Sequence, residues 1–177
     1  MIEDASQEIL RLRNEVVTFA EVFIGQKEIP PNLGFEDKNF ERHMLEVGWH
    51  PGNAWCALTA ELIWKIGYKA QYIADEIMQA EINKILSRLC SANSQATYRN
   101  FDRSDEFEVS MIPERGDIGV FKSGKTTGHT VIVREVLSPV EIVTVEGNSG
   151  DCVQSLSRLS AGWGNYELMG YIKPTVF

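Results

Sequence analysis

The sequence predicts an α+β fold, in which N-terminal helices pack on a C-terminal antiparallel β-sheet. In the first half, apolar residues recur every three or four positions, and from Phe107 onward they alternate with polar residues. Short turns rich in glycine and proline separate the expected strands, which favours antiparallel pairing. The length of 177 residues suits one well-buried core. We therefore expect residues 1–177 to form a single domain.

Four amphipathic helices are expected before the sheet. They cover residues 4–24, residues 36–47, the stretch between an N-cap at Asn53 and a stop at Gly67, and residues 72–89. The expected buried side of the last helix consists of Ile73, Ile77, Ile82, Ile85 and Leu89. Residues 28–35 contain two prolines and are interpreted as a loop, and the polar residues 90–103 as a loop or a short irregular element.

Six strands are expected in the second half. They cover residues 107–112, 117–121, 130–136, 141–146, 152–156 and 168–172. The connections between most of them are short, so each strand is expected to pair with the next one along the chain. The pattern predicts an antiparallel meander.

Composition narrows the class of protein. The formal net charge of −8 disfavours non-specific nucleic-acid binding and adhesion to anionic membranes, because both depend on lysine and arginine. No run of roughly 18 apolar residues predicts a transmembrane helix, and the N-terminal sequence lacks the pattern of a signal peptide. Three cysteines are too few and too unevenly spaced for a disulfide framework or a zinc cluster. We expect reduced thiols, synthesis in the cytoplasm, and no metal or other cofactor.

Cys56 is the candidate nucleophile. Pro51 and Gly52 prevent a helix from entering from upstream, so Cys56 is expected in the first turn of a new helix. Unpaired N–H groups and the positive end of the helix dipole favour a negative charge there. A thiol in that position ionises more easily, and the thiolate is the nucleophilic form. The alternative is an inert, buried cysteine, which is common among free thiols.

His129 is the candidate base. It follows a loop containing glycine and opens an expected strand, and imidazole suits proton transfer at neutral pH. The next strand ends in Glu146-Gly147-Asn148, whose two polar residues are expected on one strand face. Either of them could orient the imidazole. The alternatives are a histidine that only begins a strand and an ordinary Gly-Asn turn.

Five motifs together resemble the CHAP family of cysteine amidohydrolases, which belongs with the NlpC/P60 proteins to a papain-like superfamily. In chain order they are Trp55-Cys56-Ala57, Pro113 to Phe121, Gly128-His129, Val145 to Asn148, and Gly170 to Pro174. The motifs occur in the family's order and span nearly the whole chain. The resemblance implies a single catalytic domain with a nucleophile on a helix and a base on an antiparallel sheet.

The resemblance also implies roles for individual residues. Cys56 matches the nucleophile, His129 the base, Glu146 the orienting acid and Asn148 an additional polar residue of the site. Asp117 matches a family position too, and we interpret it as structural. Family members mostly cleave peptide or amide bonds of bacterial peptidoglycan, as endopeptidases or as N-acetylmuramoyl-L-alanine amidases.

The expected substrate is bacterial peptidoglycan, and four aromatic residues are candidates to line the groove that binds it. They are Trp49, Trp55, Trp163 and Tyr166, with core packing as the alternative for each. An enzyme without a signal peptide would reach the wall after release or by a non-Sec route. A holin, a secretion system or a phage tail would deliver it, and an inhibitor protein could bind it.

Two other functions are left open by the sequence. One is a cysteine amidase or acyltransferase that acts on a substrate outside the cell wall. The other is a non-catalytic module that binds the wall or belongs to a phage particle.

Overall fold

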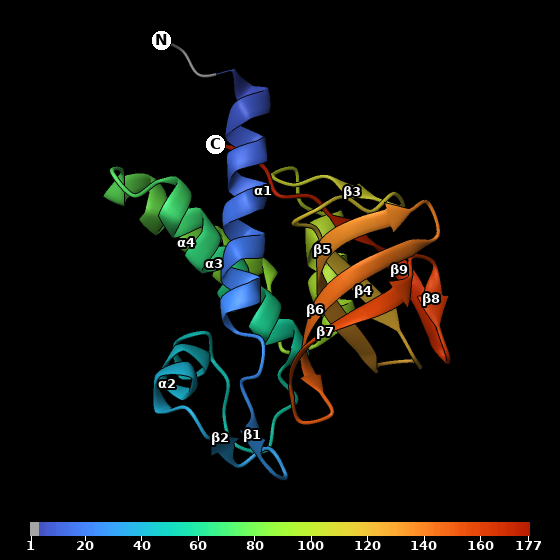
Figure 1. The fold of residues 1–177 in the computed structure, drawn as a ribbon. Helices are drawn as coiled ribbons and strands as arrows, with labels where there is room; N and C mark the ends of the chain where they lie inside the picture. Colours follow the sequence, from blue (N-terminus) through green and yellow to red (C-terminus); the bar gives the residue numbers. More distant parts are fainter. Residues whose placement is uncertain (1–3) are drawn as a thin grey trace.

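The computed structural model describes residues 4–177. In chain order its elements are α1 (Ala5–Val22), β1 (Glu28–Ile29), β2 (Gly34–Phe35), α2 (Lys38–Glu46), α3 (Cys56–Gln71), α4 (Glu76–Leu89), α5 (Ser94–Asp102), β3 (Val109–Ser110), β4 (Ile118–Lys122), β5 (Gly128–Ser138), β6 (Glu141–Ser149), β7 (Cys152–Leu159), β8 (Gly162–Trp163) and β9 (Tyr166–Ile172). The helices lie in the N-terminal part and the main sheet in the C-terminal part (Figure 1). This arrangement confirms the predicted α+β fold.

The main sheet is antiparallel, with the strand order β3-β9-β4-β5-β6-β7, and β8 pairs with β9. Strands β4 to β7 follow one another as predicted. The meander prediction is wrong at the end of the chain, because β9 returns to lie between β3 and β4. The pairing of β9 joins residues far apart in the sequence, so no local pattern of alternation could indicate it.

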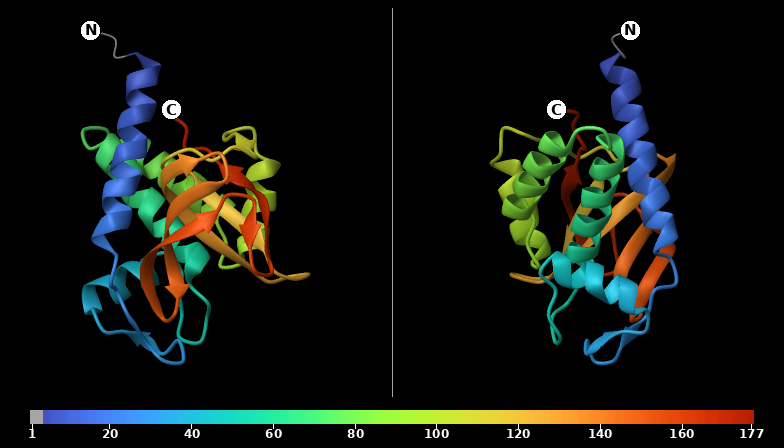
Figure 2. Two further views of the ribbon diagram at one scale, coloured as in Figure 1. Left: turned by 45° about the vertical axis from the view of Figure 1, so that its right-hand side comes forward. Right: turned by 90° about the vertical axis from the view of Figure 1, so that its left-hand side faces the viewer.

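The helices cover one face of the sheet, as the two views of Figure 2 show. Helices α1, α3 and α5 contact strands of the sheet directly, and α4 packs on α3 and α5. The main core lies between these layers and includes Leu12, Ile63, Trp64, Ile118 and Ile132. Its burial provides the main driving force for packing the two layers together.

Helix α3 begins and ends later than the sequence indicates. Trp55 occupies its N-cap position, so Asn53 is not the cap, and Cys56 is the first helical residue. The helix continues through Gly67 to Gln71. Gly67 lies against α1, where an added Cβ would come within 2.8 Å of the Val16 side chain. Its small size allows the two helices to approach closely, which explains a glycine inside a helix.

The segment between α3 and the sheet differs from its prediction in two respects. Helix α4 is capped by Asp75, and Ile73 and Ile77 are exposed, whereas Ile82 and Leu89 are buried as expected. Residues 90–103, interpreted as a loop or a short irregular element, contain the regular helix α5. Asn93 caps α5 by accepting a hydrogen bond from the backbone of Ala96.

Near the N-terminus, the observed elements agree with the predicted helices but not with the predicted loop. Helices α1 and α2 begin after the caps Asp4 and Asp37, within the predicted ranges. Residues 28–35 form the small β1–β2 hairpin rather than an open loop. Residues 1–3, which belong to the segment that lacks a signal-peptide pattern, lie outside the described residues. In residues 4–177, every helix is too short or too polar to cross a membrane.

Candidate active site

Cys56 lies at the N-terminal end of α3, where the helix meets the sheet. The preceding residue is fixed from both sides, because the Trp55 indole donates to Glu28 and the Trp55 carbonyl accepts from the Thr59 backbone. Only 7% of the Cys56 surface is exposed, so a substrate has narrow access to the thiol. Backbone N–H groups in the first turn of a helix have no partner within it, and they favour an anion at this position.

His129 and Glu146 come to the same place from neighbouring strands. His129 is the second residue of β5, and its Nε2 lies 2.9 Å from Oε2 of Glu146 on β6. The imidazole also interacts with the Cys56 thiol, which raises the pKa of His129. Since Nε2 is engaged by Glu146, Nδ1 is the nitrogen left for the sulfur. The structure thus brings together three of the four residues that the sequence singled out for chemistry.

The thiol and the imidazole stabilise each other's charged forms. Burial lowers the pKa of His129, but Cys56 and Glu146 raise it by more, to about 9. Burial also raises the pKa of the Cys56 thiol, whereas His129 lowers it by a hydrogen bond and by charge, and the net direction is downward. These opposite shifts favour a thiolate–imidazolium pair at neutral pH.

Glu146 is held by more donors than His129 alone. Arg158 on β7 donates from Nε to Oε1 at 2.8 Å and from Nη2 to Oε2 at 3.0 Å, and the Thr144 hydroxyl also donates to the carboxylate. The Glu146 side chain has no exposed surface. Burial raises the pKa of Glu146, but these partners outweigh burial and hold the pKa at about 2. The carboxylate therefore stays ionised in the interior because it is fully hydrogen-bonded.

Asn148 does not share the position of Glu146. Its backbone is left-handed, with a φ of 57°, and the pairing of β6 with β7 shifts register between Glu146 and Ser149. This irregularity breaks the alternation on which a common strand face depended. Within residues 4–177, the partner of His129 Nε2 is Glu146 and not Asn148.

The four aromatic candidates divide into two pairs. Trp49 and Trp55 are 1% and 0% exposed and pack with Phe35 in the core. Their prediction as substrate-binding residues is wrong, because neither ring can reach a substrate. Trp163 and Tyr166 are half-buried and lie beside His129, with ring centroids 6.5 and 5.8 Å from the imidazole.

Trp163 is also connected to the charged residues of the site. The Arg158 guanidinium lies 4.5 Å from the centre of the Trp163 ring, in a cation–π contact. The ring of Tyr166 packs on Trp163 at 5.4 Å. These two aromatic rings, from β8 and β9, lie together next to His129.

Two residues near the site were missed by the sequence analysis. Arg158 could have been noticed, because strand alternation places it on the same face of β7 as Gln154, which pairs with Glu146. Ser94 comes from α5, and its hydroxyl lies 3.7 Å from the Cys56 sulfur. No sequence pattern indicates that contact, since the two residues are 38 positions apart.

Other ionisable groups fall outside this site. Asp117 is buried and binds Arg13 at 2.7 Å and Lys173 at 2.6 Å, and it also accepts from the Glu114 backbone. These contacts join α1, the turn before β4 and the C-terminal segment, as a structural role requires. Burial raises the pKa of Cys90 well above its usual value, which suits an inert thiol.

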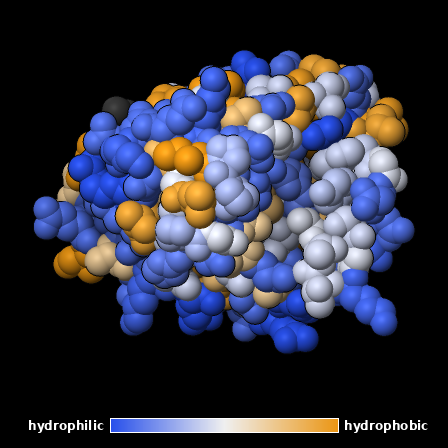
Figure 3. Space-filling model, turned by 90° about the horizontal axis from the view of Figure 1, so that it is seen from below, coloured by the Kyte–Doolittle hydropathy of each residue, from blue (hydrophilic) through white to orange (hydrophobic). Residues whose placement is uncertain are grey.

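The view from below shows the face of the molecule that carries α2 and the β1–β2 hairpin. These elements lie at the lower end of Figure 1. Figure 3 shows that hydrophobic residues on this face form separate patches among hydrophilic ones. Leu33 and Leu45, from the hairpin and α2, are among the exposed apolar residues of these elements.

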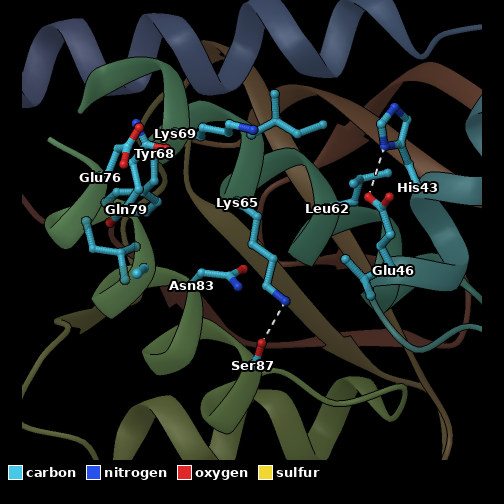
Figure 4. Close-up of a pocket in the computed structure, with 14 residues that line it drawn as sticks. His43, Glu46, Leu62, Lys65, Tyr68, Lys69, Glu76, Gln79, Asn83 and Ser87 are labelled. Atoms are coloured by element: carbon cyan, nitrogen blue, oxygen red, sulfur yellow. Dashed lines mark hydrogen bonds and ion pairs between the residues drawn. The ribbon is translucent and has the colours of Figure 1, made fainter. Parts of the chain in front are cut away.

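A hollow of about 500 Å³ lies elsewhere, between α2, α3 and α4 (Figure 4). Its lining includes His43, Glu46, Lys65, Lys69 and Asn83. Cys56, His129 and Glu146 are absent from its lining, so it is separate from the candidate active site.

The arrangement can carry out acyl transfer through sulfur. In space, a nucleophile lies next to a proton carrier, and the proton carrier lies next to an orienting carboxylate. Nucleophilic triads on unrelated folds have the same arrangement. Among residues 4–177, no cluster of His, Cys, Asp and Glu side chains has the arrangement of a metal site. The Cys56, Cys90 and Cys152 thiols are free of disulfides.

Comparison with known proteins identifies the family of this chain. The sequence model of the CHAP domain matches residues 47–148, which include Cys56, His129 and Glu146. No curated protein matches the chain. The matched segment covers more than half of the sequence and indicates an amidase or peptidase type of activity related to peptidoglycan. The chain belongs to the CHAP family.

Proposed function

We propose that this protein is a peptidoglycan hydrolase that cleaves peptide or amide bonds of the bacterial cell wall through Cys56, His129 and Glu146. The observation that carries the proposal is the position of the His129 ring, which is hydrogen-bonded to Glu146 and also interacts with the Cys56 thiol. The three residues come from α3, β5 and β6. Such convergence of a thiol, an imidazole and a carboxylate is unusual without a catalytic role.

The proposed reaction begins with the thiolate of Cys56. The sulfur attacks the carbonyl carbon of the scissile amide, and the backbone N–H of Cys56 helps to hold the resulting oxyanion. The His129 imidazolium gives its proton to the leaving amine as the C–N bond breaks. Neutral His129 then accepts a proton from water, which attacks the acyl-enzyme and releases the thiolate.

Glu146 keeps the imidazole oriented throughout these steps. Its contact with Nε2 leaves Nδ1 facing the sulfur, and its charge stabilises the imidazolium form. The bond from Arg158 fixes the carboxylate in turn.

Trp163 and Tyr166 are proposed to bind the substrate next to His129. Both rings retain exposed surface beside the imidazole. Aromatic rings pack well on the apolar faces of sugars and on peptide groups. They would position either a glycan residue or a stem peptide at the sulfur.

We also propose that the catalytic unit extends beyond the segment that matches the family. Residues 149–177 contribute β7, β8 and β9, and β7 carries the Arg158 that binds Glu146. At the other end, Glu28 binds the Trp55 that precedes Cys56. Both flanking parts therefore support the site, which favours one domain over residues 1–177.

The decisive experiment uses purified peptidoglycan and mass spectrometry of the released fragments. Wild-type protein is expected to release new fragments, whereas Cys56→Ala is expected to release none. Cys152→Ala serves as the control. Cys152 does not belong to the group formed by Cys56, His129 and Glu146, so its loss should leave cleavage intact. The masses of the fragments identify the bond as one cut by an endopeptidase or by an amidase.

Other outcomes separate the remaining functions. Protein that sediments with the wall but releases no fragments would support a binding module. Rapid alkylation of Cys56 without cleavage of peptidoglycan would support a cysteine amidase or acyltransferase with another substrate. Either outcome would contradict the proposed hydrolysis of peptidoglycan.

A further inference from the structure

Ser94 touches the atom on which the proposed chemistry depends. Its hydroxyl oxygen lies 3.7 Å from the sulfur of Cys56, and only 4% of the residue is exposed. Ser94 is the first residue of α5, a helix that was not expected from the sequence. A buried hydroxyl beside a nucleophilic sulfur has few alternative partners, so the contact requires an explanation.

The two neighbours of Ser94 hold it in place. Asn93 donates from Nδ2 to the Thr126 carbonyl at 2.8 Å, and Gln95 donates from Nε2 to the Gly124 and Thr127 carbonyls, each at 2.8 Å. These carbonyls belong to the loop between β4 and β5. The loop leads directly to His129. The same segment thus fixes Ser94 against the thiol and ties it to the strand that carries the imidazole.

Gly128, the residue before His129, packs closely against its neighbours. A Cβ added to Gly128 would lie 2.5 Å from the Phe121 carbonyl oxygen and 3.4 Å from the Ser94 side chain. The first distance is a clash with the backbone of β4, and the second is an ordinary contact. Glycine at this position therefore allows β4 and β5 to pair directly beside Ser94.

The direction of the Ser94 hydrogen bond follows from the charge of the sulfur. A thiolate can only accept, so in the thiolate–imidazolium state the serine hydroxyl must be the donor. The backbone of Thr130 also lowers the pKa of the Cys56 thiol. The ionisable groups that face it are His129 from β5 and, behind the imidazole, Glu146 from β6 with Arg158 from β7.

We propose that Ser94 is a further catalytic residue, whose hydroxyl donates a hydrogen bond to the Cys56 thiolate and so stabilises the nucleophile before attack. The inference rests on the proposed role of Cys56. As sulfur bonds to the acyl carbon it loses its negative charge, and the hydroxyl is then released from its strongest acceptor. When the acyl-enzyme is hydrolysed, the hydroxyl again stabilises the departing thiolate.

The test measures ionisation of Cys56 without any substrate. The rate of alkylation by iodoacetamide follows the thiolate fraction, and mass spectrometry of the peptide that contains Cys56 separates it from the other two thiols. In Ser94→Ala the midpoint of the rate against pH is expected to rise by about one unit, because a charge-assisted hydrogen bond is lost. Ser94→Thr keeps the hydroxyl, so its midpoint is expected near that of the wild type.

Two controls make the result decisive. Ser87→Ala removes an exposed hydroxyl on α4, and its alkylation profile should coincide with that of the wild type. Thermal unfolding identifies any variant that does not fold, and in that case Ser94→Gly replaces the alanine variant. An unchanged midpoint in a folded Ser94→Ala or Ser94→Gly protein would overturn the inference.

The same measurements distinguish failure of this inference from failure of the proposed function. If wild-type protein cleaves peptidoglycan and the midpoint does not move in Ser94→Ala, the hydrolase stands and the role of Ser94 is rejected. If the midpoint rises but peptidoglycan is not cleaved, the thiolate contact is supported and the substrate assignment is rejected.

Discussion

Glu146 contributes to the charge state of the site through His129, its hydrogen-bond partner. It is an ionised carboxylate without exposed surface, stabilised by donors from His129, Arg158 and Thr144. Its negative charge helps to raise the pKa of His129 to about 9, and the imidazole in turn lowers the pKa of Cys56. The nucleophile is therefore prepared by a residue that lies one contact away from it.

Replacing Glu146 with glutamine should separate the effect of its negative charge on His129 from the effect of its size. Glu146→Gln keeps the volume but removes the negative charge, so we expect the pKa of His129 to fall and that of Cys56 to rise. Turnover on peptidoglycan should fall by about a hundredfold or more, as is typical when a proton-transfer group is disabled. An NMR titration of the His129 ring measures the first effect directly.

A matched control exists on the same strand. Glu141 is exposed at the opposite end of β6, so Glu141→Gln should leave both the titration of His129 and the turnover unchanged. A wild-type titration curve for His129 in Glu146→Gln would show that the carboxylate does not act on the imidazole.

Arg158 should contribute more stability than an ordinary surface arginine. Its two hydrogen bonds reach a buried carboxylate, so Arg158→Met leaves an acceptor without its charged partner. We expect the free energy of unfolding to fall by about 1–3 kcal/mol, measured by urea denaturation. Arg158→Lys should restore little, because an ammonium group cannot reproduce the planar, bidentate geometry.

Arg134 provides the comparison for this effect. Its guanidinium binds Glu21 at 2.6 Å, but both side chains are about two-fifths exposed. Surface pairs of this kind contribute less than about 1 kcal/mol. Equal losses in Arg134→Met and Arg158→Met would argue against a special role for the buried carboxylate.

At the scale of the elements, the packing of α3 on α1 sets the position of Cys56. Gly67 lies at the contact, with Val16 Cγ2, Cα and N at 2.8, 3.1 and 3.2 Å from the place a Cβ would occupy. Two of these atoms belong to the backbone, so the neighbouring helix cannot avoid the new group by a side-chain rotation. The glycine is therefore required by close packing rather than by a helix end.

Gly67→Ala should destabilise the protein even though alanine is the better helix former. Helix propensity alone would stabilise by about 1 kcal/mol, but overpacking against α1 is expected to cost about 1–3 kcal/mol. We expect a net loss in urea denaturation, with a larger loss for Gly67→Leu. Lys69→Ala, at an exposed position of the same helix, is the control. A gain in stability for Gly67→Ala would show that α1 can move aside.

Local patterns predicted the elements that have a clear apolar or turn signal. Helices α1 and α2 were predicted because their apolar residues follow the helical period. Strands β4 to β7 were predicted because short turns separate them, although β4 and the first half of β5 are buried continuously rather than alternately. Helix α5 has few apolar residues, and Phe101 is the large hydrophobic side chain it buries, so it lacks such a signal. The position of β9 between β3 and β4 depends on long-range pairing, which periodicity does not encode.

The candidate site was predictable only in part for the same reason. Cys56 and His129 stand in motifs with their own local signals, namely a helix start and a strand start. Ser94 and Arg158 have none, since their importance lies in contacts with distant residues. Trp55 is a residue that was predicted to bind substrate and does not lie where it could. It precedes the nucleophile in the sequence, which suggested a place in the substrate groove, but its ring packs in the core.

At the scale of the whole molecule, the same charges that the proposed catalysis requires on Cys56 and His129 also affect the stability of the fold. A group whose pKa is raised in the folded state stabilises below its unfolded pKa, and that stability is lost as pH rises through the folded pKa. His129, raised from 6.5 to about 9, behaves in this way. Cys56, lowered from 9.0, behaves oppositely and adds stability as pH rises toward 9.0. In the window from pH 6.5 to 9, the two effects oppose each other.

Removing the thiol should reveal how His129 alone contributes to the pH dependence of the free energy of unfolding. In Cys56→Ser the opposing effect of the thiolate is absent, and so is its contribution to the pKa of His129, but Glu146 still raises the pKa of the imidazole. We expect the variant to lose about 1 kcal/mol or more of stability, relative to wild type, between pH 6.5 and 9. Urea denaturation at several pH values in this window measures the difference, in which all other titrating groups cancel. Cys152→Ser, a change of the same size on β7, should follow the wild-type profile. Parallel profiles for Cys56→Ser and wild type, in a variant whose His129 ring still titrates well above 6.5 by NMR, would mean that the sulfur carries no charge in the folded protein. The thiolate–imidazolium pair would then have to be abandoned.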